Sequence, residues 1–223
     1  MDKELLIQAI IKFISGILII ALLLFLPAGT IDYFNAWLLM AVLFIPMFIA
    51  GVVMMFKNPD LLRKRLNAKE KEGEQKGVIA MSGLMFVGGF VIAGLDYRFG
   101  WFTLPKWIIV LSTVMFLLGY LLFAEVLREN AYLSRTVEVQ ENQKVIDTGL
   151  YGIVRHPMYL ATIILFLSMP LILGSLISFI VFLIYPVIIA MRIRNEEQVL
   201  AEGLEGYEEY KERVRYKVIP FLW

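Results

Sequence analysis

The stretch TGLYGIVRHPMY, residues 148–159, leads directly into a long apolar run. His156, the only histidine of the chain, stands there between Arg155 and Pro157. A proline suits the first turn of a helix, where its missing N–H costs nothing, and it drives the preceding residue toward an extended conformation. We therefore predict that Arg155 and His156 lie on an entry loop at headgroup depth, which must line a cavity or meet water. The simpler alternative is an arginine that extends to lipid phosphate beside an ordinary boundary histidine.

Working outward from this stretch, the composition predicts a polytopic α-helical membrane protein. Hydrophobic residues make up 60% of the chain, charged residues only 18%, and the mean hydropathy is +0.75. The chain has no cysteine, which excludes disulfides, thiolate nucleophiles and thiolate metal sites. A single histidine also argues against a histidine-based metal site. We expect no metal, no nucleic-acid partner and, because the first apolar run is too long, no cleavable signal peptide.

The apolar runs predict about six transmembrane helices, with the last two forming a hairpin. The first four runs are Leu5–Leu26, Phe34–Phe56, Val78–Leu95 and Trp107–Leu127. The third is rich in glycine, which would let a neighbouring helix approach closely at Gly83, Gly88 and Gly89. The region Tyr159–Ala190 is apolar, and we expect Pro170 and Leu173-Gly174-Ser175 to break it into two shorter halves.

The basic residues predict the orientation. With six spans, every lysine and arginine except Arg98 and Lys106 falls on the side that holds both termini and the RHP loop. The positive-inside rule then makes both termini cytoplasmic, in a multi-pass protein of the plasma membrane. Residues 57–77 are strongly polar and are predicted to form a solvated loop with a basic face toward anionic lipid.

The polar segment after the hairpin, residues 191–223, returns to the side of the RHP loop. Arg192 and Glu196 are four residues apart, so they share a helix face. An apolar stripe at helical spacing predicts an amphipathic helix on the membrane, formed by Val199, Leu200, Leu204, Tyr207 and Tyr210. We expect charged and phenolic side chains of this segment to meet the RHP loop, a set that comprises Arg192, Glu196, Glu197, Tyr207, Tyr210 and Arg213.

Four stretches together, GLYGIVRHPMY, the apolar hairpin, RIRNEEQVL and GYEEYKERVRYKVIP, resemble the isoprenylcysteine carboxyl methyltransferase family. That family is part of a wider set of integral-membrane methyltransferases that includes phospholipid N-methyltransferases. The resemblance covers about residues 128–223, and the upstream NPDLLRKR and DYRFGW are similar to prokaryotic members. Residues 1–127 hold the four N-terminal transmembrane helices predicted from the apolar runs. A catalytic methyltransferase region would follow in residues 128–223, made of a cofactor loop, the RHPMY motif, the hairpin and a C-terminal helix.

The resemblance also implies a pocket for S-adenosylmethionine (SAM). The cofactor-binding residues that it assigns are Gln143, Lys144, Val145, Ile146, Tyr151, His156, Pro157, Met158, Tyr159 and Glu196. It makes Arg192 a substrate-side catalytic arginine, and it makes Arg213, the arginine of the family's final R-V segment, a further catalytic residue. A carboxylate acceptor needs no base and would be oriented by Arg192. An amine acceptor must lose a proton, which Glu197 or His156 would receive.

The chain departs from the family pattern at three places, and these places are where the substrate would be selected. Ala161 replaces a usual glycine, Leu204-Glu205 a usual Phe-Gly, and Arg213-Val214-Arg215 a usual Arg-Val-Pro. The expected function is methyl transfer from SAM to a lipidic acceptor, foremost carboxyl O-methylation of an isoprenylcysteine-like molecule. The alternatives are N- or S-methylation of a phospholipid or another small molecule, an NADPH-dependent membrane lipid reductase, and a non-catalytic lipid-binding protein. The expected partners are membrane lipids and a lipidic or prenylated small molecule.

Overall fold

The structure, a computed structural model, describes residues 3–66, 73–133 and 136–223, and these residues contain no strand. The prediction of an all-helical membrane fold is confirmed. In chain order the helices are α1 (Lys3–Ala28), α2 (Phe34–Lys57), α3 (Pro59–Leu66), α4 (Gly73–Phe99), α5 (Lys106–Glu129), a 3-10 turn η1 (Gly149–Gly152), α6 (Pro157–Ile172), α7 (Leu176–Phe182), α8 (Tyr185–Gly203) and α9 (Tyr207–Arg213).

Five helical stretches within the described residues are long and apolar enough to cross a membrane. They are α1, α2, Gln75–Phe99 of α4, α5, and the stretch Leu176–Gly203 that joins α7 to α8. The remaining apolar helix, α6, has 16 residues and is shorter than this set. The chain is thus a multi-pass membrane protein, whereas the count of six spans stays a prediction.

The hairpin turns where expected, although one of its two expected breaks is wrong. The turn is made by Leu173–Ser175, where Gly174 has a φ of +81° and the Ser175 side chain accepts a hydrogen bond from the Ser178 N–H at 3.1 Å. Helix α6 runs through Pro170 to Ile172 instead of ending at the proline. Pro170 lies in the last turn of α6, where the proline removes only its own N–H from the ladder and does not end the helix.

Small residues set how closely the helices approach. A Cβ added at Gly89 would lie 2.2 Å from the Phe182 ring, so α4 and α7 pack closely only because this position is glycine. The same prediction fails for Gly83 and Gly88, where an added Cβ would meet no described atom within 4 Å. Of the three glycines, Gly89 therefore carries the close helix contact.

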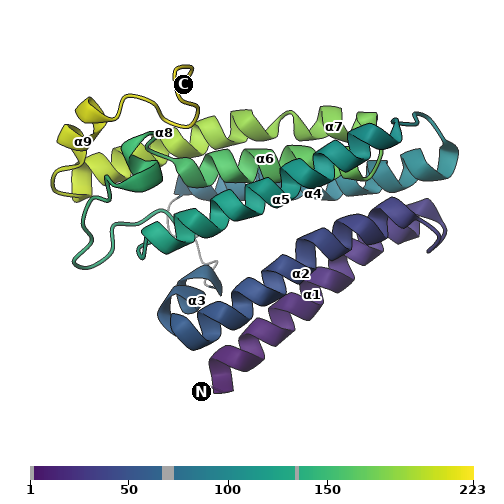
Figure 1. Cartoon of the computed structure of the whole chain (residues 1–223), viewed down its shortest axis with the longest axis horizontal. Coiled ribbons are helices and arrows are strands. Elements are labelled where there is room, and N and C mark those ends of the chain that lie inside the picture. Colours follow the sequence, from purple (N-terminus) through teal and green to yellow (C-terminus); the bar gives the residue numbers. More distant parts are fainter. Residues whose placement is uncertain (1–2, 67–72, 134–135) are drawn as a thin grey trace.

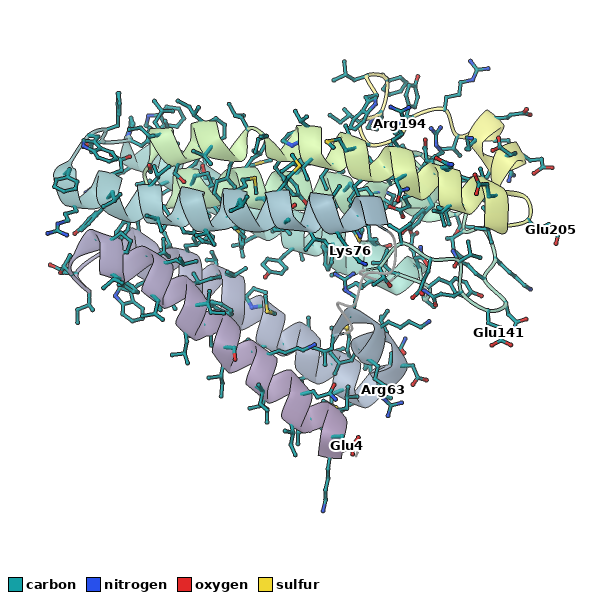
Figure 2. The ribbon with its side chains drawn as sticks, turned by 180° about the vertical axis from the view of Figure 1, so that it is seen from behind. Glu4, Arg63, Lys76, Glu141, Arg194 and Glu205 are labelled. Atoms are coloured by element: carbon teal, nitrogen blue, oxygen red, sulfur yellow. The ribbon has the colours of Figure 1, made fainter. Side chains whose placement is uncertain are left out.

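The bundle has two distinct ends. The turns that join α1 to α2, α4 to α5 and α6 to α7 lie at one end, and α3, α9 and the segment after α5 lie at the other, here called the site end (Figure 1). Charged side chains gather toward the site end, including Glu4, Arg63, Lys76, Glu141, Arg194 and Glu205 (Figure 2). Part of the expected polar loop 57–77 is helical, as α3 and the start of α4, and residues 67–72 lie outside the described residues.

A buried polar contact closes the opposite end. Asp96 of α4 accepts hydrogen bonds from the Ser175 hydroxyl at 2.5 Å and from the Phe102 N–H at 3.0 Å. Tyr33, at the start of α2, donates to the Leu173 carbonyl at 2.7 Å. These contacts fix the tip of the hairpin and thereby place its two helices, α6 and α8, side by side at the site end.

Candidate active site

A cleft opens at the site end between three parts of the chain. Its walls come from residues 130–133 and 136–146, from the stretch Tyr151–Tyr159 that enters α6, and from α8 and α9. The cleft holds about 840 Å³ of space free of protein atoms, counted up to its open mouth. The wall combines apolar side chains with a few polar ones, as the walls of small-molecule sites do.

The RHP motif is held by the backbone of the last residues of the sequence. The Arg155 N–H donates to the Tyr216 carbonyl at 2.9 Å, and the His156 N–H donates to the Lys217 carbonyl at 2.7 Å. His156 has the non-helical dihedrals φ −127° and ψ 61° before Pro157, the first residue of α6. Arg155 and His156 are buried and line the cleft, which confirms that the loop lines a cavity. The alternative of an arginine extended to lipid phosphate is wrong.

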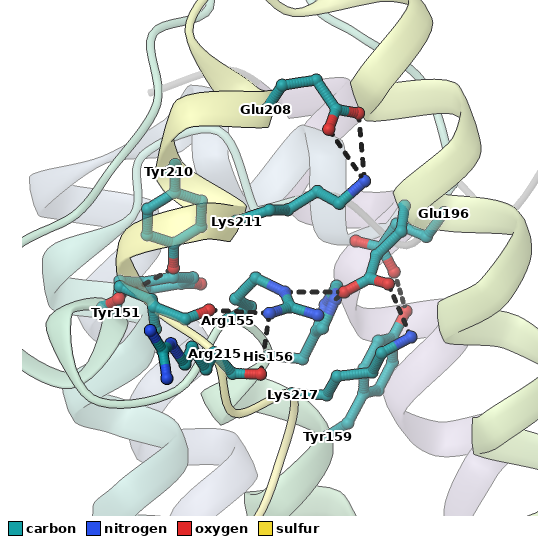
Figure 3. Close-up of polar contacts among 12 residues, drawn as sticks. Tyr151, Arg155, His156, Tyr159, Glu196, Glu208, Tyr210, Lys211, Arg215 and Lys217 are labelled. Carbon is teal, nitrogen blue, oxygen red and sulfur yellow. Dashed lines mark hydrogen bonds and ion pairs between the residues drawn. The ribbon is translucent and has the colours of Figure 1, made fainter. Parts of the chain in front are cut away.

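Arg155, His156, Glu197 and Lys217 form a compact group, here called the Glu197 cluster. One oxygen of Glu197, Oε1, lies 2.8 Å from Arg155 Nε and 3.2 Å from His156 Nε2, and the other, Oε2, lies 2.7 Å from Lys217 Nζ. Arg155 Nη1 also donates to the Val214 and Arg215 carbonyls at 2.6 and 3.0 Å (Figure 3). The buried Glu197 carboxylate is thus satisfied by partners from two other segments of the chain, the entry to α6 and residues 214–217.

A second group, the Tyr159 cluster, comprises Tyr159, Arg192 and Glu196 and borders the cleft. The Tyr159 hydroxyl donates to Glu196 Oε2 and accepts from Arg192 Nε, the latter at 2.9 Å (Figure 3 labels Tyr159 and Glu196). The prediction that Tyr159 and Glu196 share one pocket is confirmed. Arg192 and Glu196, one turn apart on α8, face the same cleft, as expected from their spacing.

With this geometry described, comparison with known proteins becomes informative. A model of the isoprenylcysteine carboxyl methyltransferase (ICMT) family matches residues 108–202, which run from α5 almost to the end of α8. Residues 108–202 are thus similar to the ICMT family. The matched residues include both clusters except Lys217, and this match supports a membrane methyltransferase.

One curated relative outside the methyltransferases also matches. The Delta(14)-sterol reductase of Mus musculus is 31% identical over 91 residues, which cover 40% of this chain and 22% of the reductase. The match thus spans about a fifth of the length of that relative. Because the match covers only part of the reductase, the activity of the reductase is a property of that protein alone.

The cofactor loop assigned by the ICMT resemblance does line the cleft. Gln143, Lys144, Val145 and Ile146 all border it. The loop is shaped by the Gln143 side chain, which accepts from the Gln140 N–H at 2.8 Å, and by Asn142, which has a left-handed φ of +56°. Tyr151 closes the next turn: its hydroxyl accepts from Asn130 Nδ2 at 3.0 Å, and its carbonyl accepts from the Tyr210 hydroxyl at 2.8 Å. Burial raises the pKa of Tyr151 and of Tyr210, so both phenols stay protonated.

Three of the predicted site residues are not brought to the cleft. Pro157 is the first residue of α6 and does not border the cleft. Glu197 is not part of the cleft wall and has both oxygens occupied, so it is placed poorly for the expected role of proton acceptor. Arg213 is exposed at the end of α9 and pairs with Asp147 at 2.9 Å. The other predicted cofactor residues and Arg192 border the cleft.

Sequence reasoning missed one wall of the cleft. Asn130, Tyr132, Leu133, Thr136, Val137 and Glu138 contribute to it from the segment that follows α5. This segment is largely irregular, so no periodic pattern distinguishes its inward-facing residues. Its polar character alone was visible in the sequence.

Proposed function

We propose that this protein, which is similar to the ICMT family over residues 108–202, transfers a methyl group from SAM to a lipidic acceptor at the membrane boundary. The proposal is carried by the meeting of the cofactor loop Gln143–Ile146 with Tyr159 and Glu196 in one cleft at the end of a transmembrane hairpin. Such a cleft lies where a polar cofactor from water and an acceptor from the bilayer can both arrive.

The chemistry of the cleft fits SAM. Tyr207 lines it with a buried hydroxyl that has no hydrogen-bond partner among the described residues. Burial raises the pKa of Tyr207, so the phenol keeps its proton and can donate to a ligand. Glu196 can accept from ribose hydroxyls or from an ammonium group, and the loop Gln143–Ile146 offers backbone groups. When bound, SAM supplies a methyl group on a sulfonium for in-line displacement.

On the acceptor side, the protein has to orient a nucleophile rather than to activate it. Arg192 can hold a carboxylate bidentately, and a carboxylate is ionised without help. An amine would need a base, whereas the oxygens of Glu197 are occupied by Arg155, His156 and Lys217. This difference favours carboxyl O-methylation, and an isoprenylcysteine-like molecule is the acceptor that the family suggests.

We place the site end in the cytoplasm of a cell bounded by the plasma membrane. Lys12, Arg63 and Lys64 lie at this end, and Arg98 and Lys106 lie at the other. Because the chain has no cysteine, single cysteines at Glu141 and at Ile31 would report the two sides. Both residues are exposed, at the site end and in the α1–α2 turn respectively. Labelling of the Ile31 position from the cytoplasm would overturn this orientation.

A second candidate, a reductase that uses a nicotinamide cofactor, is favoured by the identity to the Delta(14)-sterol reductase. Cofactor binding separates the two functions. The protein in lipid nanodiscs would be titrated calorimetrically with SAM and with NADPH, and labelled SAM would be incubated with lipid extracts. We expect binding of SAM alone and a label that appears in the lipid fraction. Binding of NADPH without SAM would overturn the methyltransferase proposal in favour of the reductase.

A further inference from the structure

The last residues of the sequence form a closed turn with an apolar tip. The Val218 and Ile219 N–H groups both donate to the Trp223 carbonyl at 2.9 Å, and the Leu222 and Trp223 N–H groups donate to the Ile219 carbonyl at 3.2 and 3.0 Å. Pro220 has no N–H, so within residues 218–223, all of which the structure describes, only the Phe221 N–H lacks a partner inside the turn. Four of the five N–H groups of residues 218–223 are therefore satisfied inside the turn, which lowers the cost of moving it from water to the edge of a bilayer.

The apolar side chains at the tip of this turn are exposed. Phe221 is 88% exposed and Leu222 78%, which is unusual for large apolar residues of a small turn. Phe221 has a φ of +65°, a conformation that bulky side chains rarely adopt. Uncommon backbone conformations of this kind persist where the surrounding structure holds them and are a starting point for a functional hypothesis.

The turn starts at a residue that is buried among the spans. The chain passes from Val214, packed with Leu204 and Tyr207 near α9, to Val218, which is fully buried in the main transmembrane core. The tip therefore follows a residue already embedded among the spans. Figures 1 and 2 agree that the last residues lie on the flank of the bundle along α8, set back from α9 toward the spans.

The exposed apolar surface of α7 and α8 runs toward this turn. Exposed apolar residues form a stripe at helical spacing along α7 and α8, made of Ile180, Ile184, Val187 and Met191. The next residue on that stripe is the exposed Arg194, so the apolar surface ends there. Figure 2 shows Arg194 beside the last residues of the chain. An exposed basic residue, Arg215, precedes the tip, as is usual beside an interfacial anchor.

We propose that residues 219–223 form an anchor that seats in the headgroup–acyl boundary of the bilayer. The anchor holds residues 214–217 across the RHP motif, since those residues supply the carbonyls that bind the Arg155 and His156 N–H groups. Trp223 is then the interfacial tryptophan of the site end, whereas Trp37, Trp101 and Trp107 lie at the opposite end. This inference requires only a multi-pass membrane protein and holds whichever cofactor the cleft binds.

The depth of the tip can be measured with a spin label, since the chain has no other cysteine to label. Leu222→Cys would be compared in phospholipid vesicles with Val187→Cys, on the lipid-facing stripe, and with Glu141→Cys, in an exposed loop. We expect the label at position 222 to collide with oxygen and to be protected from a water-soluble nickel chelate, as at position 187. Nickel accessibility equal to that of position 141 would overturn the anchor. So would protection that disappears when each nanodisc holds one copy, because the tip would then pack on a second copy of the chain.

The link to the RHP motif has a separate test. Phe221→Ser/Leu222→Ser should speed exchange of the Arg155 and His156 amides in bilayers on the order of tenfold, equivalent to about 1.4 kcal/mol. Phe102→Ser, a comparably exposed aromatic at the opposite end, is the control and should leave both amides unchanged. Equal exchange in the tip variant and the wild type, with the label still buried in lipid, would show that the anchor does not brace the motif.

Discussion

Glu196 and Glu197 are neighbours on α8, yet they belong to different clusters. Successive residues of a helix point about 100° apart, so one carboxylate borders the cleft and the other points into the protein. Glu196 meets the Tyr159 hydroxyl at the cleft wall. Glu197 is held by Arg155, His156 and Lys217 away from it.

The difference shows that burial gives two similar residues different roles. The Glu197 cluster joins the α6 entry, α8 and residues 214–217, and its charges meet one another. A buried network of this kind resists removal of any one member. The Tyr159 cluster instead presents its polar groups to the space where ligands would bind. We therefore expect substitutions in the first cluster to affect folding and substitutions in the second to affect binding and turnover.

The largest expected effect is that of Glu197→Ala. Removing one partner of a buried ion pair leaves uncompensated charge and costs about 3–5 kcal/mol. Equilibrium unfolding in mixed micelles would measure this loss. Glu202→Ala, which alters an exposed pair with Gln198 on the same helix, is the control and should change stability by less than about 1 kcal/mol. A Glu197→Ala protein of normal stability that no longer methylates would move Glu197 from the structural cluster to the chemistry.

Glu196 and Arg192 should separate binding from turnover. Glu196→Gln should weaken SAM binding by about 1.5–3 kcal/mol, the value of a charge-assisted hydrogen bond. Arg192→Ala should leave SAM affinity nearly unchanged and abolish most turnover, because a guanidinium on the cationic cofactor would repel it. Calorimetric titration with SAM, followed by single-turnover assays, distinguishes the two. Equal losses of SAM affinity would indicate that the two residues act together through the Tyr159 hydroxyl.

The sequence was sufficient for the parts of this comparison that depend on local pattern. The apolar runs predicted the spans within a few residues, and the turn at Leu173–Ser175 brought Tyr159 and Glu196 together. Spacing on one helix predicted that Arg192 and Glu196 share a face. These inferences rest on hydropathy and helical period, which the sequence displays directly.

The sequence predicted that the polar segment after the hairpin meets the RHP loop, but it did not predict which groups make the contacts. Residues 214–217 bind the RHP motif mainly through carbonyls, which leave no mark on side-chain pattern. Which of Glu196 and Glu197 faces the cleft depends on how α8 is rotated against α6, and only packing decides that rotation. The exposed position of Arg213 likewise follows from where α9 ends, since helix boundaries are poorly specified by sequence.

A smaller effect is expected from Tyr207→Phe on α9. The Tyr207 hydroxyl is buried without a partner among the described residues, so its removal should leave the fold as stable or slightly more stable. If the hydroxyl donates to the cofactor, SAM affinity should fall by about 0.5–1.5 kcal/mol. Tyr210→Phe is the matched control, because its hydroxyl donates to the Tyr151 carbonyl and its loss should lower stability instead. Unchanged SAM affinity in Tyr207→Phe would show that the hydroxyl faces no part of the ligand.

The smallest effect is expected for Arg213→Ala, because Arg213 belongs to neither the Glu197 cluster nor the Tyr159 cluster. The resemblance to the ICMT family assigns Arg213 a catalytic role, whereas the structure places it on the surface in an ion pair with Asp147. Exposed pairs contribute about 0.2–1 kcal/mol, so stability should change little, and SAM affinity and turnover should stay close to wild type. Lys211→Ala, which removes a comparable exposed pair with Glu208 on α9, is the control. If Arg213→Ala lost turnover while Lys211→Ala did not, α9 would have to move toward the cleft when ligands bind, and the division between a structural and a functional cluster would then describe only the unliganded protein.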